Sequence, residues 1–157
     1  MTTNYSFFGN YRGLVVDNVD PEKQNRIRVR IHSVFDGVDD DHLPWAAAAF
    51  PLMTGAGPGF GWFGVPAIGA EVFCFFEQGD YNAPVYFAEA PDGIHGHPSI
   101  ADTNYPDRRG FQTASGHMLY FDDKSDVIRL QHSSGASIQI DGSGNITITG
   151  TTVTINP

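Results

Sequence analysis

The sequence predicts an all-β protein in two parts, a small closed barrel followed by a ribbon of short strands. Its 157 residues include 18 glycines and 10 prolines, which interrupt the chain too often for long helices. Over residues 11–90, β-branched and aromatic residues gather in short runs between these turn formers. From residue 113 onward, apolar residues recur at every second position in short segments, which is typical of strands with one buried face.

The first part covers residues 11–91 and contains several strand candidates. They lie at 13–18, 26–31, 71–77 and 83–88, with 45–50 as either a strand or a turn of helix. The segment 26–31 alternates strictly, and the residues that face water or a partner are Arg26, Arg28 and Arg30. Short strands with little helix over about 80 residues predict a barrel that hides its edges by closure, and an OB-fold is the simplest choice.

The second part, residues 113–157, carries apolar pairs that would all lie on one face of a narrow ribbon. The pairs are Leu119/Phe121, Ile128/Leu130, Ile138/Ile140, Ile146/Ile148 and Val153/Ile155. Leaving such a face in water costs about 1.5–3 kcal/mol for each side chain. Identical chains that wrap around a common axis would bury it, so we expect an intertwined trimeric β-prism with these residues in its core. The alternative is that the ribbon packs against the barrel as a sheet of a sandwich.

The remaining segments and the net charge exclude or disfavour several classes of protein. Residues 1–10 are interpreted as an N-terminal extension, and residues 92–112 as a linker filled with prolines and turn formers. The net charge of −9 disfavours binding to nucleic acid. A single cysteine, Cys74, excludes a disulfide within the chain. Because the sequence shows neither a signal peptide nor a membrane-spanning run, we expect assembly in the cytoplasm and no stable membrane insertion.

The polar residues give little support to catalysis. Most of the acidic residues stand in turn contexts, so we expect no paired carboxylates of a glycosidase, no enzyme activity and no cofactor. His95 and His97, repeated three times around an axis, could hold a transition metal, although a polar loop with surface histidines is the alternative. The run 39–42 has carboxylates for Ca²⁺ but not the spacing of a chelating loop. The glycine-rich segment 55–61 lacks a phosphate-binding ending, and we expect a subunit contact or a tight turn there.

Several segments, taken in order, resemble a known family. They read RGLVVDNVDP and NRIRVRI within residues 12–31, then LPWA, GAGPGFG, PAIGAEVF, FEQGD and APV up to residue 85. This order resembles the OB-fold domain in the central spikes of contractile injection systems, which include contractile phage tail spikes and VgrG proteins of type VI secretion. Residues 113–117, 122–123, 134–135 and 144–148 resemble the β-helical needle that follows that domain.

The resemblance implies a homotrimer with three OB domains and a triple-stranded β-helix needle. Such a needle pierces the target envelope when the sheath contracts, as part of a virion or injection particle. Because only ten residues precede Tyr11 and the chain stops at Pro157, we expect a separate baseplate hub protein and a PAAR-type tip protein. The three arginines at 26–30 would meet an acidic patch on the hub or a neighbouring subunit, with 36–41 as one candidate.

Two other functions compete with a structural spike. An OB-fold barrel could be a ligand-binding module for sugar or nucleic acid, and the ribbon could belong to a trimeric phage fibre or adhesin. A cell-wall hydrolase would need a further domain, for which the segment 92–112 leaves no room.

Overall fold

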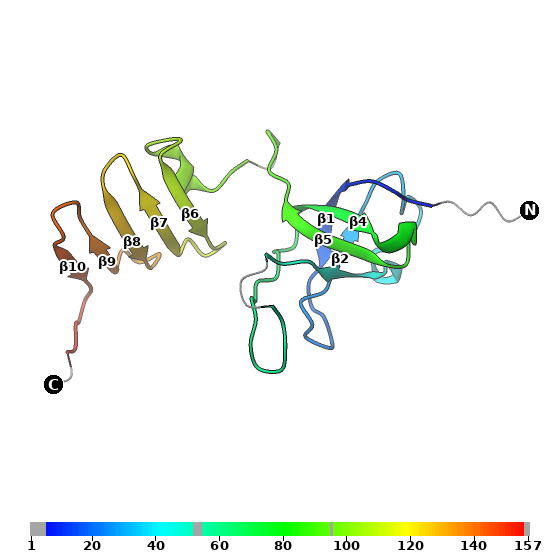
Figure 1. Cartoon of the computed structure of the whole chain (residues 1–157), viewed down its shortest axis with the longest axis horizontal. Helices are drawn as coiled ribbons and strands as arrows, with labels where there is room; N and C mark the ends of the chain where they lie inside the picture. The colour runs from blue at the N-terminus through cyan, green and yellow to red at the C-terminus, as the bar shows by residue number, and fades with distance from the viewer. Residues whose placement is uncertain (1–5, 52–54, 95, 156–157) are drawn as a thin grey trace, which may run out of the picture. The chain divides into compact units, whose positions relative to one another are not determined.

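A computed structural model describes residues 6–51, 55–94 and 96–155 of the chain, which form two compact units, Met1–His95 and Gly96–Pro157 (Figure 1). Both units are built from β-strands and short 3-10 helices. Among the described residues, no helix has the length and apolar character that crossing a membrane requires. The predicted all-β class is therefore confirmed.

The first unit is a closed barrel of five strands. They are β1 (Tyr11–Asp17), β2 (Ile27–Arg30), β3 (Trp45–Ala48), β4 (Glu71–Phe76) and β5 (Pro84–Glu89). The strands follow one another around the barrel in the order β1-β2-β3-β5-β4, and β4 pairs with β1 to close it. The β3–β5 pair is parallel and the other pairs are antiparallel. This closed five-stranded barrel is consistent with the predicted OB-fold.

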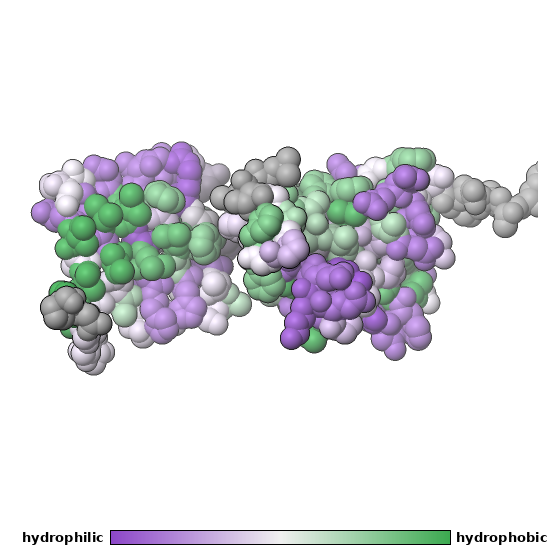
Figure 2. Space-filling view, turned by 60° about the horizontal axis from the view of Figure 1, so that its bottom comes forward, coloured by the Kyte–Doolittle hydropathy of each residue, from purple (hydrophilic) through white to green (hydrophobic). Residues whose placement is uncertain are grey.

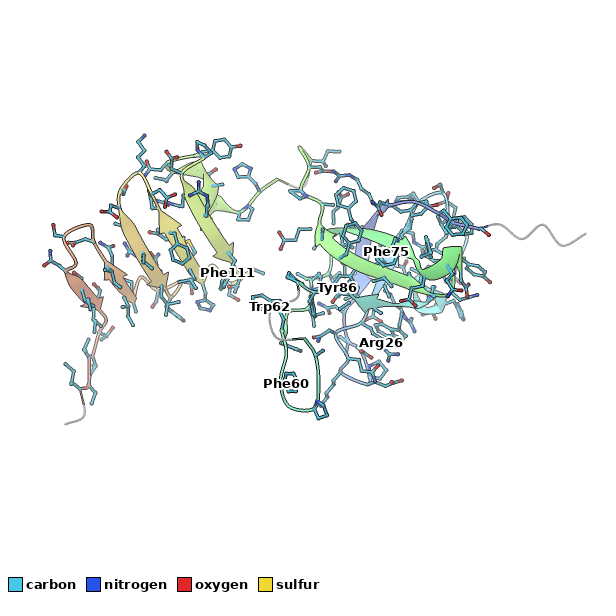
Figure 3. The ribbon with its side chains drawn as sticks, viewed as in Figure 1. Arg26, Phe60, Trp62, Phe75, Tyr86 and Phe111 are labelled. Atoms are coloured by element: carbon cyan, nitrogen blue, oxygen red, sulfur yellow. The ribbon has the colours of Figure 1, made fainter. Side chains whose placement is uncertain are left out.

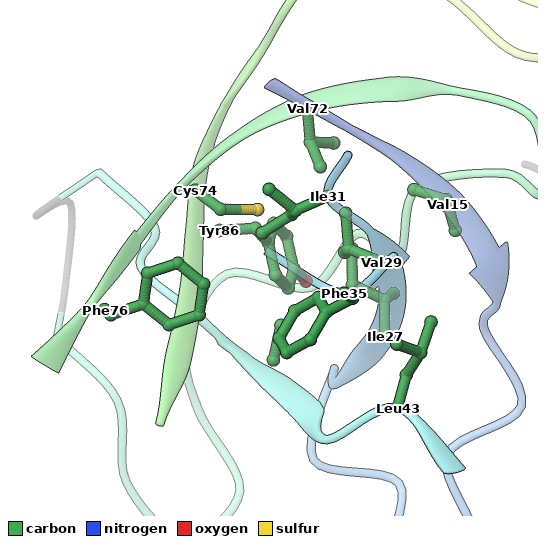
Figure 4. Packing of buried hydrophobic residues seen from close by; sticks show 11 residues of the cluster. Val15, Ile27, Val29, Ile31, Phe35, Leu43, Val72, Cys74, Phe76 and Tyr86 are labelled. Carbon is green, nitrogen blue, oxygen red and sulfur yellow. The ribbon is translucent and has the colours of Figure 1, made fainter. Parts of the chain in front are cut away.

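Alternation along the strands fills the barrel. The buried cluster comprises Val15, Ile27, Val29, Ile31, Phe35, Leu43, Ala46, Val72, Cys74, Phe76 and Tyr86 (Figure 4). A strand and a helical turn were both open for the segment 45–50; its first four residues form strand β3, and Ala46 is fully buried inside the barrel. At Gly13 the interior leaves no room for a side chain, because a Cβ there would lie 2.3 Å from Val29 Cγ1.

The second unit is a meander of five antiparallel strands. They are β6 (Arg108–Gln112), β7 (Met118–Asp122), β8 (Val127–Gln131), β9 (Ser137–Ile140) and β10 (Ile146–Thr149). Each strand pairs with the next one along the chain, so the spatial order equals the sequence order. Three further 3-10 turns complete the described elements: η1 (Asp40–His42) and η2 (Glu77–Gly79) in the first unit, and η3 (Ser99–Asp102) in the second.

The structure corrects one boundary and leaves one strand unformed. Residues 92–112 were predicted to be a linker without strands, but 108–112 form β6 and 99–102 form a 3-10 turn. The sequence of β6 shows no alternation of apolar and polar residues, because it begins with two arginines and a glycine. The strand is stabilised by its pairing with β7. Val153 and Ile155 were predicted to continue the strand pattern, whereas residues 151–155 form no strand in the chain described here.

Candidate functional site

Two rows of apolar side chains cross one face of the second sheet. Because directly opposite residues of antiparallel strands lie on the same face, the register defines both rows. The first row comprises Phe111, Leu119, Leu130, Ile138 and Ile148, and the second comprises Phe121, Ile128, Ile140 and Ile146. Arg109 of β6 lies opposite Phe121 and ends the second row. We call these nine apolar residues the apolar face.

The apolar face is open to water in the single chain. Leu119 is partly buried, and the exposed fractions of the other eight range from 38% at Ile140 to 67% at Ile146. Figure 2 shows hydrophobic residues gathered on the second unit. Exposed apolar surface that is this continuous usually marks an interaction site. The sequence predicted all of these residues except Phe111, which lies in the segment assigned to the linker.

The opposite face of the sheet is polar and its side chains bind one another. The guanidinium of Arg108 lies 4.5 Å from the ring centroid of Tyr120, which is buried. Arg129 donates to Gln139 at 3.1 Å and to Ser137 at 3.3 Å. The polar side chains of this face therefore find contacts within the chain, whereas the apolar face is exposed to water.

Asp122 connects the polar face to the loop before β6. It accepts hydrogen bonds from Arg108 at 2.7 and 2.9 Å, from Asn104 at 2.9 and 3.0 Å, and from the Ser125 backbone at 3.0 Å. Its burial opposes ionisation, but the bonds from Arg108, Asn104 and Ser125 outweigh this, so the pKa of Asp122 is lowered to about 2. The carboxylate therefore stays charged and holds the first hairpin in place.

The hairpin turns at one end of the sheet contain a pair of histidines whose rings lie against each other at a tilt of 38°. His117 and His132 have ring centroids 4.4 Å apart. Nδ1 of His117 accepts the Ser133 N–H at 3.2 Å, and Nδ1 of His132 accepts the Ser134 N–H at 3.1 Å. Because the His117 ring accepts the backbone N–H of Ser133, it joins the turn before β7 to the turn after β8.

The arginines of β2 and its preceding turn find partners within their own chain. Arg26 binds Asp20 through Nη2 at 2.7 Å and Nε at 3.1 Å, and these hydrogen bonds hold the pKa of Asp20 well below its usual range. Arg28 donates to the Asp41 carbonyl, and Arg30 contacts Asp40 and donates to the Phe35 carbonyl at 2.6 Å.

The acidic loop 36–41, which the sequence offered as an intermolecular partner of these arginines, is thus already contacted by Arg28 and Arg30 of the same chain. A strictly alternating pattern shows which side chains face outward, but it does not show that a later loop folds back onto them. A hub or subunit contact through Arg26, Arg28 and Arg30 stays a prediction.

The two candidate metal sites differ in what the structure describes. His95 lies outside the described residues, while Nε2 of His97 lies 2.9 Å from Asp102 Oδ1 in an exposed pair. A metal held by His95 and His97 therefore stays a prediction. Asp39, Asp41 and His42 bring ligand atoms within 4.8 Å of one another, but all three are exposed and their backbone spacing is that of a single 3-10 turn.

The glycine-rich segment after β3 forms a surface loop. Gly57 and Phe60 exchange two backbone hydrogen bonds of 3.2 Å, so the predicted tight turn is confirmed at this point. The loop exposes three aromatic side chains, Phe60, Trp62 and Phe63. Figure 3 shows Phe60 and Trp62 on a loop that extends from the barrel.

The chain thus combines a closed five-stranded barrel with a five-stranded sheet whose apolar face is exposed. The family model described as the type VI secretion system/phage-baseplate injector OB domain matches residues 11–89, which begin with β1 and end with β5. The chain belongs to this family. A search of curated proteins found no match.

Family membership confirms the predicted resemblance for the barrel. The protein is a baseplate-associated structural component, and the family indicates a non-enzymatic role. It also indicates association with other baseplate components within a virion or injection particle.

Proposed function

We propose that this protein is the subunit of a homotrimeric baseplate spike, in which residues 113–157 of three chains form a needle that pierces the target envelope. The observation that carries the proposal is the apolar face, whose two rows run without interruption across β7–β10. Two further copies would cover these rows and remove them from water. At about 1.5–3 kcal/mol for each large apolar side chain, this burial is a strong driving force for association.

The polarity of the sheet supports a closed trimer rather than an open assembly. If three copies turn their apolar faces to a common axis, their polar faces, with Arg129 and Gln139, remain in water. A cyclic arrangement then leaves no apolar face to recruit a fourth copy. Backbone pairing around such a dry core would give the stiffness under axial load that a piercing needle needs, without metal or disulfide.

A hub protein above the barrel and a PAAR-type tip protein below the needle are the partners we propose for the assembled particle. Association with baseplate components is the family's general property, while these two identities rest on the resemblance described above. The rival functions, an OB-fold ligand-binding module and a trimeric fibre or adhesin, have no contact in the described residues that favours them.

The proposal is tested by the mass of the full chain in solution, measured by light scattering behind size exclusion. We expect about 51 kDa, three times the 17.1 kDa of one chain. Ile148→Asp places a charge on the apolar face and should give monomers, while Thr147→Asp on the polar face of the same strand should keep the trimer. A wild-type mass of 17 kDa, or equal behaviour of the two variants, would overturn the proposal.

A further inference from the structure

The barrel carries two apolar surface features of its own, an exposed loop and a partly exposed cluster of phenylalanines. The first is the loop 55–70, which we call the aromatic loop. Its sequence contains no charged residue, although the chain has a net charge of −9. Its Phe60, Trp62 and Phe63 have exposed fractions between 50% and 75%. An uncharged loop with three exposed aromatic rings is suited to a dry contact with another apolar surface.

The second feature is an aromatic cluster on the outer wall of the barrel. Along β4, Val72 and Cys74 point inward, so Phe73 and Phe75 point outward, where Figure 3 labels Phe75. Phe87 of β5 joins them, with ring centroids 6.2 Å from Phe73 and 5.9 Å from Phe75. Two charged residues border the cluster on one side: Arg12 lies 4.8 Å from the Phe73 ring centroid and pairs with Glu71 at 3.2 Å. Aromatic side chains with charged residues at their edge are typical of protein interfaces.

We propose that the aromatic loop of one copy packs on the Phe73/Phe75/Phe87 cluster of the next copy, in a ring of three barrels. A loop and a cluster that differ from each other make a head-to-tail contact, and such contacts close into rings when the rotation permits. One contact, repeated three times, covers both apolar features of every barrel at once. A partner of another kind seated on either feature would leave the other feature in water.

This inference rests on the proposed trimer, because the needle is what brings three barrels together. Once the needles are joined, the loop of one barrel meets its neighbour at the effective concentration of a tethered pair, about millimolar for short linkers. A contact too weak to hold free barrels together is then formed in the assembled spike. The inference thereby gives the barrel a role in the assembly beyond that of a connector between the needle and the hub.

The test is cross-linking of the full chain with a short bismaleimide, using the variant Gly64→Cys/Glu89→Cys, which keeps every aromatic ring of the proposed contact and changes two exposed positions beside it. Both positions are on the surface, and the native Cys74 does not compete, because it is fully buried and burial raises the pKa of its thiol to about 12. We expect covalent species of two and three chains on a denaturing gel. The matched control is Gly64→Cys/Val38→Cys, whose second cysteine is also on the surface because Val38 is 36% exposed, and it should give single chains only.

The outcomes separate this inference from the proposed function. A light-scattering mass of one chain for the wild type would overturn both. A trimeric mass with no cross-linked chains, with cross-links inside one chain, or with equal yields in the two cysteine pairs would overturn the loop-to-cluster contact and leave the needle trimer standing. If the mass is that of a trimer and no chains are cross-linked, the two apolar features remain available to another baseplate component.

Discussion

Arg108 and Asp122 lie directly opposite each other on β6 and β7, and their side chains are joined by a 2.7 Å ion pair that is almost fully buried on the Asp122 side. The same carboxylate binds Asn104 before β6 and the Ser125 backbone after β7. Asp122 therefore joins the start of β6 to the end of β7. The sequence of β6 itself has little intrinsic strand preference.

The first prediction is that Asp122→Asn destabilises the second unit in a pH-dependent way. Burial opposes ionisation of Asp122, but hydrogen bonds from Arg108 and Asn104 outweigh it, so its pKa falls from 3.8 to about 2 on folding. A pKa lowered on folding gives stability that is present above pH 4 and disappears as the pH falls towards 2. Thermal unfolding followed by circular dichroism should show a lower midpoint for Asp122→Asn at pH 7, and a difference that shrinks below pH 4.

Asp123→Asn is the matched control for that prediction. Asp123 pairs with Arg109 on the surface, where both side chains are largely exposed and an ion pair contributes little. Its midpoint should stay close to that of the wild type at both pH values. Equal losses in the two variants would show that charge in this turn, and not the bonding of Asp122, sets the stability.

The arrangement of the barrel could be predicted largely from the sequence, because its strands alternate and its turns contain strong turn formers. The segment 26–31 shows this best: Ile27 and Val29 are buried as the alternation predicts. The strand β6 could not be predicted in this way. Its stability comes from a long-range ion pair and from a glycine that allows close approach, and neither is visible in a local pattern.

The second prediction concerns Phe111, which the structure adds to the apolar face. Phe111 lies opposite Leu119 and is 57% exposed in the single chain. If three copies bury this face, Phe111→Ser should weaken the trimer by about 1.5–3 kcal/mol per chain. The measurement is the guanidinium concentration at which the mass falls from three chains to one. Thr147→Ser, at an exposed position on the polar face of β10, is the control and should leave this concentration nearly unchanged.

The third prediction concerns the barrel core. Phe35 is buried and meets Phe76 edge to face, with ring centroids 5.9 Å apart. Phe35→Ala should therefore destabilise the barrel by about 3–5 kcal/mol, since it removes a ring and leaves a cavity. Fluorescence of Trp45, which lies in β3 beside Arg28, reports this unfolding in guanidinium. Phe8→Ala removes a ring that is mostly exposed and should cost less than about 0.5 kcal/mol.

The candidate site could be predicted from the sequence where it depends on alternation, and not where it depends on the folding of loops. The pairs in β7–β10 predicted one shared face, and the register places them on one face. The arginines at 26–30 were predicted to contact an acidic patch on the hub or on a neighbouring subunit. In the structure, Arg30 contacts Asp40 of its own chain. An outward side chain can bind water, a partner or a returning loop, and strand periodicity does not distinguish the three.

The last prediction is that Gly110→Ala opens the β6–β7 pair. A Cβ at Gly110 would lie 2.2 Å from the Leu119 carbonyl oxygen and 2.7 Å from Tyr120 Cα, and these backbone atoms cannot move without separating the strands. Such overpacking costs about 1–3 kcal/mol, so amide hydrogen exchange in β6 and β7 should become about 5- to 150-fold faster. Gly93→Ala is the control, because a Cβ there meets no atom within 4 Å. Unchanged exchange in Gly110→Ala would mean that the two strands have room for the methyl group, and would contradict the close approach at Gly110.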